Sequence, residues 1–169
     1  GIARLNANRV LDSTSRPGTG VDIGVGPNSG VLAIIQQPDN RVLIGGFFQA
    51  VNGTNRQGIA RLNANGSLDA TFNPDTENST VFSIALQPDG KVFVGGYIST
   101  LNGANRGIVR LDANGSLDPS FSPPLGTNAT VRTIAWQSDG GVLIGGHFAT
   151  VQGTNRQDIA RLQPNGTLD

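Results

Sequence analysis

A ten-residue stretch occurs three times in this chain, and its recurrence constrains the fold more than any other feature. The copies are RVLIGGFFQA at 41–50, KVFVGGYIST at 91–100 and GVLIGGHFAT at 141–150, so the glycine pairs recur at intervals of fifty residues. The residues before each pair are β-branched, aliphatic or aromatic, which is typical of a strand buried on both faces. Glycine weakens a strand interior, so a repeated pair indicates either a bulge or the close approach of another backbone.

A tight turn and another apolar segment precede each copy. The turn sequences are Pro-Asp-Asn, Pro-Asp-Gly and Ser-Asp-Gly. Asp-Asn and Asp-Gly accept the positive φ angles that two-residue hairpin loops require. The apolar segments are therefore the predicted first strands of three hairpins, at Val31–Gln37, Val81–Gln87 and Val131–Gln137.

A second repeated block follows each hairpin. Its copies are NGTNRQGIARLNANGSLD at 52–69, NGANRGIVRLDANGSLD at 102–118 and QGTNRQDIARLQPNGTLD at 152–169, and the chain opens with the end of the same block, GIARLNANRVLD at 1–12.

This second block predicts two further strands in each unit. Ile59–Leu62 is a predicted third strand, the Asn-Gly pair that follows predicts a hairpin turn, and Ser67–Phe72 is a predicted short fourth strand, as is Ser116–Phe121. No segment has the 3.6-residue apolar period or the capping residues of a helix. Each unit is therefore predicted to be four antiparallel strands.

Four short strands in a unit of this length are typical of a β-propeller blade. Blades crowd as they converge on a shared axis, and glycine permits that approach. We favour this architecture over a solenoid of stacked hairpins, and predict an all-β, single repeat domain of about three blades with an extra N-terminal half-blade. The predicted boundaries within 1–169 are a half-blade at 1–12 and blades at 31–72, 81–121 and 131–169.

The order of these motifs resembles a known family. IALQPDGKVFVGG at 84–96, followed by NRGIVRLDANGSLDPSF at 105–121, resembles the delta-60 repeats of bacterial propeller-like proteins, over nearly the whole chain. The strand that ends in Gly-Gly is also similar to kelch repeats, but the Tyr and Trp that follow it in kelch blades are missing. The delta-60 resemblance implies a tandem repeat of a large protein that is secreted or displayed at the cell surface, and it transfers no catalytic residue.

The first unit departs from the pattern, and the number of blades predicts an assembly. Arg9-Val10 replaces Gly-Ser in the turn, Ser15 stands where Phe72 stands in the next unit, and Arg16–Asn28 is a predicted longer loop. Because propellers close with about four to eight blades, we expect further blades of a longer tandem array or a homo-oligomer, in which two chains would supply six blades. The chain has no methionine, so we expect a processed product or a piece of a longer chain.

Composition disfavours several classes of partner. The net charge is zero and charged residues make up 14% of the chain, so no bulk electrostatic attraction to nucleic acid is expected. No apolar run is long enough for a transmembrane helix, so no membrane insertion is expected. The chain has no cysteine and one histidine, His147, in the place of Phe47 and Tyr97. No metal site and no cofactor are therefore predicted, and His147 is interpreted as a packing or rim residue.

Two sets of repeated charged residues have both a structural and a functional interpretation. Asp39, Asp89 and Asp139 could contribute to calcium sites, but one carboxylate per segment is too few, so we interpret them as turn residues. The arginines at 61, 110 and 161 recur with the aspartates at 69, 118 and 169. They could form a ring of sites for an anionic ligand, but a residue present in every blade is better explained as a structural ion pair.

One further surface is a candidate for ligand binding. Trp136, the single tryptophan, could stack on a sugar ring, and the polar segments after the glycine strands could hydrogen-bond sugar hydroxyls. The candidate residues of these segments are Asn55, Arg56, Asn105, Arg106, Asn155 and Arg156. The alternative is that Asn serves turns because it tolerates positive φ, and that the tryptophan lies in the core.

We therefore predict a structural or protein-interaction module whose partner is itself, as a homo-oligomer or as part of a longer array. A multivalent carbohydrate-binding protein that recognises glycans is the alternative. Catalytic triads, paired carboxylates and phosphate loops are not evident, and the nearly identical blades offer little variation from which to build an active site, so no enzymatic activity is expected.

Overall fold

The computed structural model describes residues 3–15, 18–22, 30–74, 76, 78–99 and 105–169. All regular structure within these ranges is β-strand, so the all-β prediction is confirmed. Among the same residues, no helix is long and apolar enough to cross a membrane.

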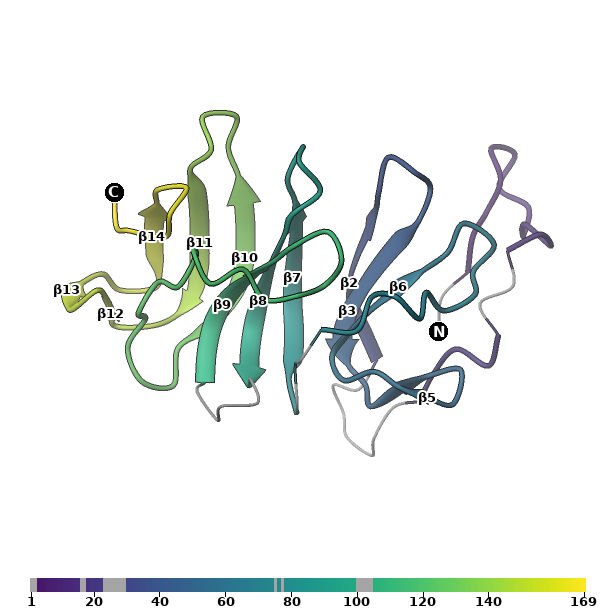
Figure 1. Ribbon diagram of the computed structural model, residues 1–169, viewed down its shortest axis with the longest axis horizontal. Helices are drawn as coiled ribbons and strands as arrows, with labels where there is room; N and C mark the ends of the chain where they lie inside the picture. Colours follow the sequence, from purple (N-terminus) through teal and green to yellow (C-terminus); the bar gives the residue numbers. More distant parts are fainter. Residues whose placement is uncertain (1–2, 16–17, 23–29, 75, 77, 100–104) are drawn as a thin grey trace.

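Three antiparallel sheets with the same strand order follow one another along the chain. Figure 1 shows that they lie side by side in the order of the sequence. The three predicted first strands, and the predicted third strand at Ile59–Leu62, lie within one residue of their predicted positions. The sheets consist of β2 (Gly30–Gln36), β3 (Val42–Phe47) and β6 (Ile59–Leu62); of β7 (Thr80–Leu86), β8 (Val92–Ser99) and β9 (Asn105–Leu111); and of β10 (Thr130–Trp136), β11 (Val142–His147) and β14 (Ile159–Leu162). We call these sheets blades 1, 2 and 3.

The second glycine of each pair allows a bulge within its own blade. The register between β2 and β3 shifts after Val31, which pairs with Gly46, and the same shift occurs in the other two blades. A Cβ atom on Gly46 would collide with the carbonyl oxygen of Gly30, and one on Gly96 would collide with that of Thr80. Only glycine fits this close backbone approach.

The first glycine of each pair receives the next blade. A Cβ atom on Gly45 would lie 2.5 Å from Val81 Cγ1, and one on Gly95 would lie 2.9 Å from Val131 Cγ1. The inner strand of each following blade thus packs into the space that the missing side chain leaves. Both explanations offered for the Gly-Gly pair, a bulge and a close approach, are confirmed, and each applies to a different glycine.

The predicted fourth strand is shorter than expected. In blade 1 it is reduced to one bridge between Leu62 and Leu68, and the same bridge recurs in the other units. The chain leaves the sheet at Asp69, whose carboxylate accepts hydrogen bonds from both the backbone N–H and the hydroxyl of Thr71. This turn directs Phe72 into the interior, where its side chain is fully buried.

Short hairpins at one end of the outer blades were missed in the sequence. β4 (Ala50–Val51) pairs with β5 (Thr54–Asn55), and β12 (Thr150–Val151) pairs with β13 (Thr154–Asn155), while β1 (Val21–Asp22) joins β4. Asn52 and Gly53, with φ of 52° and 74°, make the two-residue loop of the first hairpin. In blade 2, β8 continues to Ser99 and β9 begins at Asn105, and residues 100–104 between them lie outside the described residues. The predicted long loop at 16–28 lies largely outside the described residues.

The core lies between the blades. Leu43, Ile59 and Phe72 of blade 1 are buried against Val81 and Val94 of blade 2. A second cluster joins blades 2 and 3 in the same way, with the rings of Phe93 and Phe121 packed edge to face at its centre. The stability of each blade therefore depends on contact with its neighbours, as expected of repeat architectures.

Candidate interaction site

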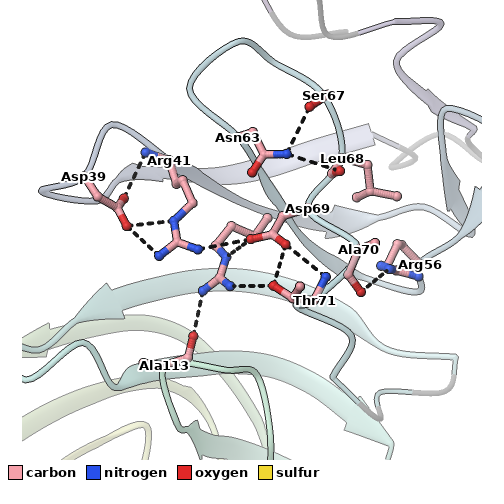
Figure 2. Close-up of polar contacts among 11 residues, drawn as sticks. Asp39, Arg41, Arg56, Asn63, Ser67, Leu68, Asp69, Ala70, Thr71 and Ala113 are labelled. Atoms are coloured by element: carbon pink, nitrogen blue, oxygen red, sulfur yellow. Dashed lines mark hydrogen bonds and ion pairs between the residues drawn. The ribbon is translucent and has the colours of Figure 1, made fainter.

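An arginine and an aspartate form an ion pair at the outer edge of each unit. Arg61 Nε lies 2.8 Å from Asp69 Oδ2, and both side chains are buried. Figure 2 shows Asp69 with its neighbour Thr71. Arg110 and Asp118 repeat this pair at 2.8 Å in blade 2. The aspartate of each pair also holds the turn described above, so the arginine has a fixed, hydrogen-bonded anion beside it.

The same arginine reaches across to the next blade. Arg61 Nη1 donates to the carbonyl oxygen of Ala113 at 2.6 Å, and Arg110 Nη1 donates to that of Pro164 at 2.7 Å. Arg4, in the N-terminal half-blade, donates to the carbonyl oxygen of Ala64 at 2.7 Å. We call this arrangement of arginine, own-blade aspartate and next-blade carbonyl the clamp. It explains why the arginine recurs with the repeat, since Arg4, Arg61 and Arg110 each tie one unit to the next.

The aspartate of the clamp is held in its charged form. Burial by itself would raise the pKa of Asp69, but hydrogen bonds from Thr71 and the Arg61 guanidinium hold that pKa well below its usual range. The pKa of Asp118 is affected in the same way. Burial by itself would raise this pKa, but hydrogen bonds from Lys91, Ser120 and Arg110 lower it well below its usual range.

Two neighbours complete each clamp. A second cation contacts the aspartate, since Arg41 Nη1 lies 3.2 Å from Asp69 Oδ2 and Lys91 Nζ lies 2.7 Å from Asp118 Oδ2. The guanidinium carbon of Arg61 lies 4.6 Å from the centroid of the Phe72 ring, a distance suited to a cation–π contact. Each of the three guanidinium nitrogens of Arg61 and of Arg110 therefore donates a hydrogen bond within the protein, which supports the structural interpretation of this repeated pair over an anion-binding one.

In blade 3 the arginine is arranged differently. Arg161 Nε donates to Gln137 Oε1 at 2.7 Å, Nη2 donates to Asp139 Oδ2 at 2.6 Å, and Nη1 pairs with Asp169. Gly141 stands where Arg41 and Lys91 stand in the other blades, and the guanidinium occupies the space that their side chains fill. Within the described residues Arg161 reaches no carbonyl of another blade.

Blade 3 also exposes the face that blades 1 and 2 bury. Leu43 and Phe93 are 0% exposed but their counterpart Leu143 is 36% exposed, and Ile59 and Ile108 are 1% exposed where Ile159 is 68% exposed.

Cross-strand pairing places these residues together. Leu143 pairs with Arg161 and Gly145 pairs with Ile159, so the four share one side of the sheet. We call Leu143, Gly145, Ile159 and Arg161 the open face. In the two internal junctions the same positions are covered by the following blade.

A pocket lies at the opposite end of the row of blades, beside blade 1. A pocket of about 310 Å³ lies between the N-terminal half-blade and blade 1, lined in part by Arg4, Ser15, Ile34, Leu62 and Gly66. Ile34 is 59% exposed, whereas Ile84 and Ile134, at the same position in blades 2 and 3, are half-buried against the preceding blade. The pocket is therefore the part of a blade junction that the half-blade leaves unfilled.

The residues proposed for carbohydrate binding do not come together. Trp136 lies at the end of β10 beside the hairpin turn, half-buried and packed against the core between blades 2 and 3. Asn155 lies in the small hairpin at the opposite end of the blade, as Figure 1 shows for β13. The seven residues of β10 span roughly 20 Å, so one sugar ring could not contact both groups.

The polar segments themselves serve mainly local contacts. Arg56 is buried, and its Nη1 donates to the carbonyl oxygen of Asn55 at 2.7 Å. Arg106 bonds the hydroxyl of Ser122, and Arg156 Nη1 donates to the carbonyl oxygen of Asn155 at 3.0 Å. Asn105 belongs to β9, and its side chain lies outside the part of the structure that is described.

The turn aspartates and His147 were the other candidates from the sequence. Each turn aspartate accepts a hydrogen bond from the backbone N–H two residues later, at 3.0 Å in all three blades, as turn residues should. His147 was interpreted as either a packing residue or a rim residue. Its side chain is 84% exposed, so it is a rim residue. Across the described residues, no three His, Cys, Asp or Glu side chains are grouped so as to hold a metal ion.

Comparison with known families gives a match in three segments of the chain. A family model described as "Domain of unknown function (DUF5122) beta-propeller" matches residues 37–72, 87–121 and 137–169, which together make up more than half of the sequence. No curated protein matches the chain.

Two solved structures are similar to this chain. The extracellular domain of a protein described as a hybrid two component system, BT4673 from B. thetaiotaomicron, aligns with a TM-score of 0.50 and 17% identity over 93% of this chain and 19% of that one. A structure of the extracellular domain of the same designation, described as a one component system, aligns with a TM-score of 0.47 and 19% identity over 90% of this chain and 18% of that one. The chain thus spans about a fifth of the structure that it matches, and the likeness concerns the fold.

Proposed function

Because the chain belongs to the DUF5122 beta-propeller family, we propose that it is a structural and protein-interaction module without enzymatic activity, which assembles with copies of itself or with further blades. The observation that carries this proposal is the open face of blade 3. It repeats, residue for residue, a face that is buried in both internal junctions, and it exposes Ile159 to 68%. Ile159 and Leu143 are both exposed on this face, and contiguous exposed apolar surface with a polar rim is typical of an interaction site.

The chemistry of the repeated residues supports the absence of catalysis. The clamp arginines and aspartates are engaged with one another and with backbone groups, so they are not available to a substrate. We place the module outside the cell or on its surface, as a delta-60-like tandem repeat; the extracellular domains that resemble this fold are consistent with that location.

Sedimentation velocity over a range of protein concentrations tests the proposal. We expect the wild-type chain to associate as concentration rises and Ile159→Glu to weaken association at least about tenfold, since burial of an isoleucine is worth roughly 1.5–3 kcal/mol and a tenfold change is 1.4 kcal/mol. Leu117→Glu is the matched control, because Leu117 is 40% exposed but lies outside the open face. A chain that stays monomeric throughout, or equal effects of the two variants, would contradict the proposal.

Carbohydrate binding is the second candidate, and it makes a different prediction. A glycan array probed with wild type and Trp136→Ala would give saturable, tryptophan-dependent binding if the chain were a lectin. We expect no such binding, because Trp136 packs against the interblade core and lies at the opposite end of its blade from Asn155 and Arg156.

A further inference from the structure

Asn-Gly pairs occur in several turns of this chain, and this dipeptide has a reaction of its own. Those within the described residues are Asn52-Gly53, Asn65-Gly66, Asn114-Gly115 and Asn165-Gly166, while Asn102-Gly103 lies outside them. Glycine has no side chain to shield its backbone nitrogen, so this nitrogen can attack the side-chain carbonyl carbon of the asparagine before it. Each pair is therefore a candidate site of chemical modification.

The reaction is deamidation, and water is its only co-reactant. A bond forms between the glycine nitrogen and the asparagine Cγ, the bond from Cγ to Nδ2 breaks, and ammonia leaves with the proton that the glycine nitrogen gives up. Water then opens the succinimide ring at either carbonyl and gives aspartate or isoaspartate. The reaction requires that Cγ reach the glycine nitrogen and that the glycine N–H be free to lose its proton.

The turn that follows the outer strand of blade 1 opposes both requirements. Asn65 Oδ1 accepts hydrogen bonds from the backbone N–H of Ser67 at 3.0 Å and from the Ser67 hydroxyl at 2.8 Å, so two bonds hold the asparagine side chain. The N–H of Gly66 donates to the carbonyl oxygen of Asn63 at 2.8 Å. Both groups that must react are therefore engaged in other bonds.

The equivalent turns of blades 2 and 3 repeat these bonds. Asn114 Oδ1 accepts from the N–H and the hydroxyl of Ser116 at 2.9 and 2.7 Å. Asn165 Oδ1 accepts from the N–H and the hydroxyl of Thr167 at 3.0 and 2.7 Å. In both turns the glycine N–H again donates, at 2.8 Å, to the carbonyl oxygen two residues before the asparagine. A hydroxyl two residues after the asparagine is thus common to all three turns.

Asn52, in the hairpin of β4 and β5, is held differently. Its Oδ1 accepts one hydrogen bond, from the backbone N–H of Gly20 at 3.0 Å, and within the described residues it accepts none from Thr54. The N–H of Gly53 donates to Asp22 Oδ2 at 3.3 Å, a longer bond than that of the blade turns. Both partners belong to the segment that contains β1, so local separation of this segment from the hairpin frees both reacting groups together.

We propose that Asn52 is the main deamidation site of the folded chain among these four, and that the hydroxyls of Ser67, Ser116 and Thr167 protect the Asn-Gly pairs of the blade turns. This inference is independent of the proposed self-association, because it concerns turns within single blades. Each conversion adds one negative charge to a chain whose net charge is zero. The modified chains should therefore separate from the parent chain by anion exchange.

Incubation of the full chain at mildly alkaline pH, followed by peptide mass mapping at intervals, tests the proposal. We expect Asn52 to convert at least about fivefold faster than Asn65, Asn114 or Asn165, since each further hydrogen bond that must open is worth a factor of about two to ten. In urea, which unfolds the turns, the four rates should become equal, because glycine follows the asparagine at every site. Equal rates in the folded chain, or the same ranking in urea, would overturn the proposal.

The role of the hydroxyl is tested at one turn, with the other turns of the same chain as references. Ser67→Ala removes the hydroxyl bond to Asn65 and should raise the rate there about two- to tenfold, with Asn114 and Asn165 unchanged. Ser67→Thr keeps a hydroxyl, as Thr167 does, and should keep the parent rate. Circular dichroism establishes that both variants are folded. No acceleration in Ser67→Ala, or equal acceleration in Ser67→Thr, would overturn the protection by the hydroxyl.

Discussion

At the scale of residues, two arginines in equivalent positions have very different environments. Arg110 is buried, pairs with Asp118 and bonds the next blade, whereas Arg161 is 32% exposed and bonds only within its own blade among the described residues. Removing one partner of a buried ion pair leaves the other charge uncompensated, and this is far more costly than losing a surface pair. The matched arginines thus allow the contribution of the clamp to be measured.

We expect Arg110→Ala to lower the free energy of unfolding by about 3–5 kcal/mol. Arg161→Ala should lower it by less than about 1 kcal/mol in the isolated chain. Urea titrations followed by the fluorescence of Trp136, which packs against the core between blades 2 and 3, measure both values. Similar losses for the two variants would show that the clamp does not stabilise the junction.

The same clamp predicts the response to acid. The pKa of Asp118 in the folded chain lies below its ordinary value of about 4, so the unfolded chain binds more protons between these two values. The free energy of unfolding should therefore be constant well above pH 4 and fall as the pH drops below it. Asp118→Asn should reduce this slope while lowering stability at neutral pH; an unchanged slope in urea titrations at several pH values would contradict the assignment.

Part of this chemistry could be predicted from the sequence. The recurrence of Arg61 and Asp69 once per unit indicated a structural ion pair, because residues that serve the blade repeat with it. The third member, the carbonyl of Ala113, could not be predicted, because a backbone acceptor leaves no mark on residue type. Likewise, nothing in the composition around Trp136 distinguished a half-buried ring from an exposed one.

At the scale of elements, the two glycines of each pair have separable roles. A side chain on Gly96 would collide with the backbone carbonyl of Thr80, which the bulge holds in place. A side chain on Gly95 would meet the ends of Val131 and Ile134 in the next blade, and these can shift. A side chain on Gly145, which lies on the open face, would meet the side chain of Thr133 in its own blade.

Alanine substitutions should therefore destabilise the chain in a fixed order. Gly95→Ala is expected to cost about 1–3 kcal/mol, the usual range for overpacking, and Gly96→Ala should cost more because backbone cannot move aside as a side chain can. Gly145→Ala should be the mildest. Thermal and urea unfolding of the three variants give the order, and a milder effect of Gly96→Ala than of Gly145→Ala would refute the bulge as its reason.

The elements that were misjudged from sequence are the shortest ones. The hairpin of β4 and β5 has two residues in each strand, too few for an alternating pattern to be visible. The fourth strand was predicted as a strand from Ser67 to Phe72 but consists of one bridge, because the hydrogen bonds of Asp69 turn the chain inward. Local hydrogen bonds of this kind compete with sheet pairing and are hard to weigh from residue type alone.

At the scale of the whole molecule, the blades present unlike surfaces at the two ends. The open face of blade 3 and the exposed side of blade 1 around Ile34 are different surfaces, so a contact between them across two chains, as the proposed self-association would require, would be heterologous. Heterologous contacts either close into a ring or continue as a fibre. Two chains would supply six blades, within the range of about four to eight in which propellers close, so we expect a closed pair. Sequence repeats predicted the blades, but which faces remain exposed required coordinates.

Native mass spectrometry of the wild-type chain tests this account most directly, because it counts the copies in each particle. The account predicts that single chains give way to particles of twice the mass of one chain as concentration rises, with no larger species, and that Ile159→Glu returns the population to single chains. Single chains at every concentration, or an open-ended series of larger particles, would contradict it.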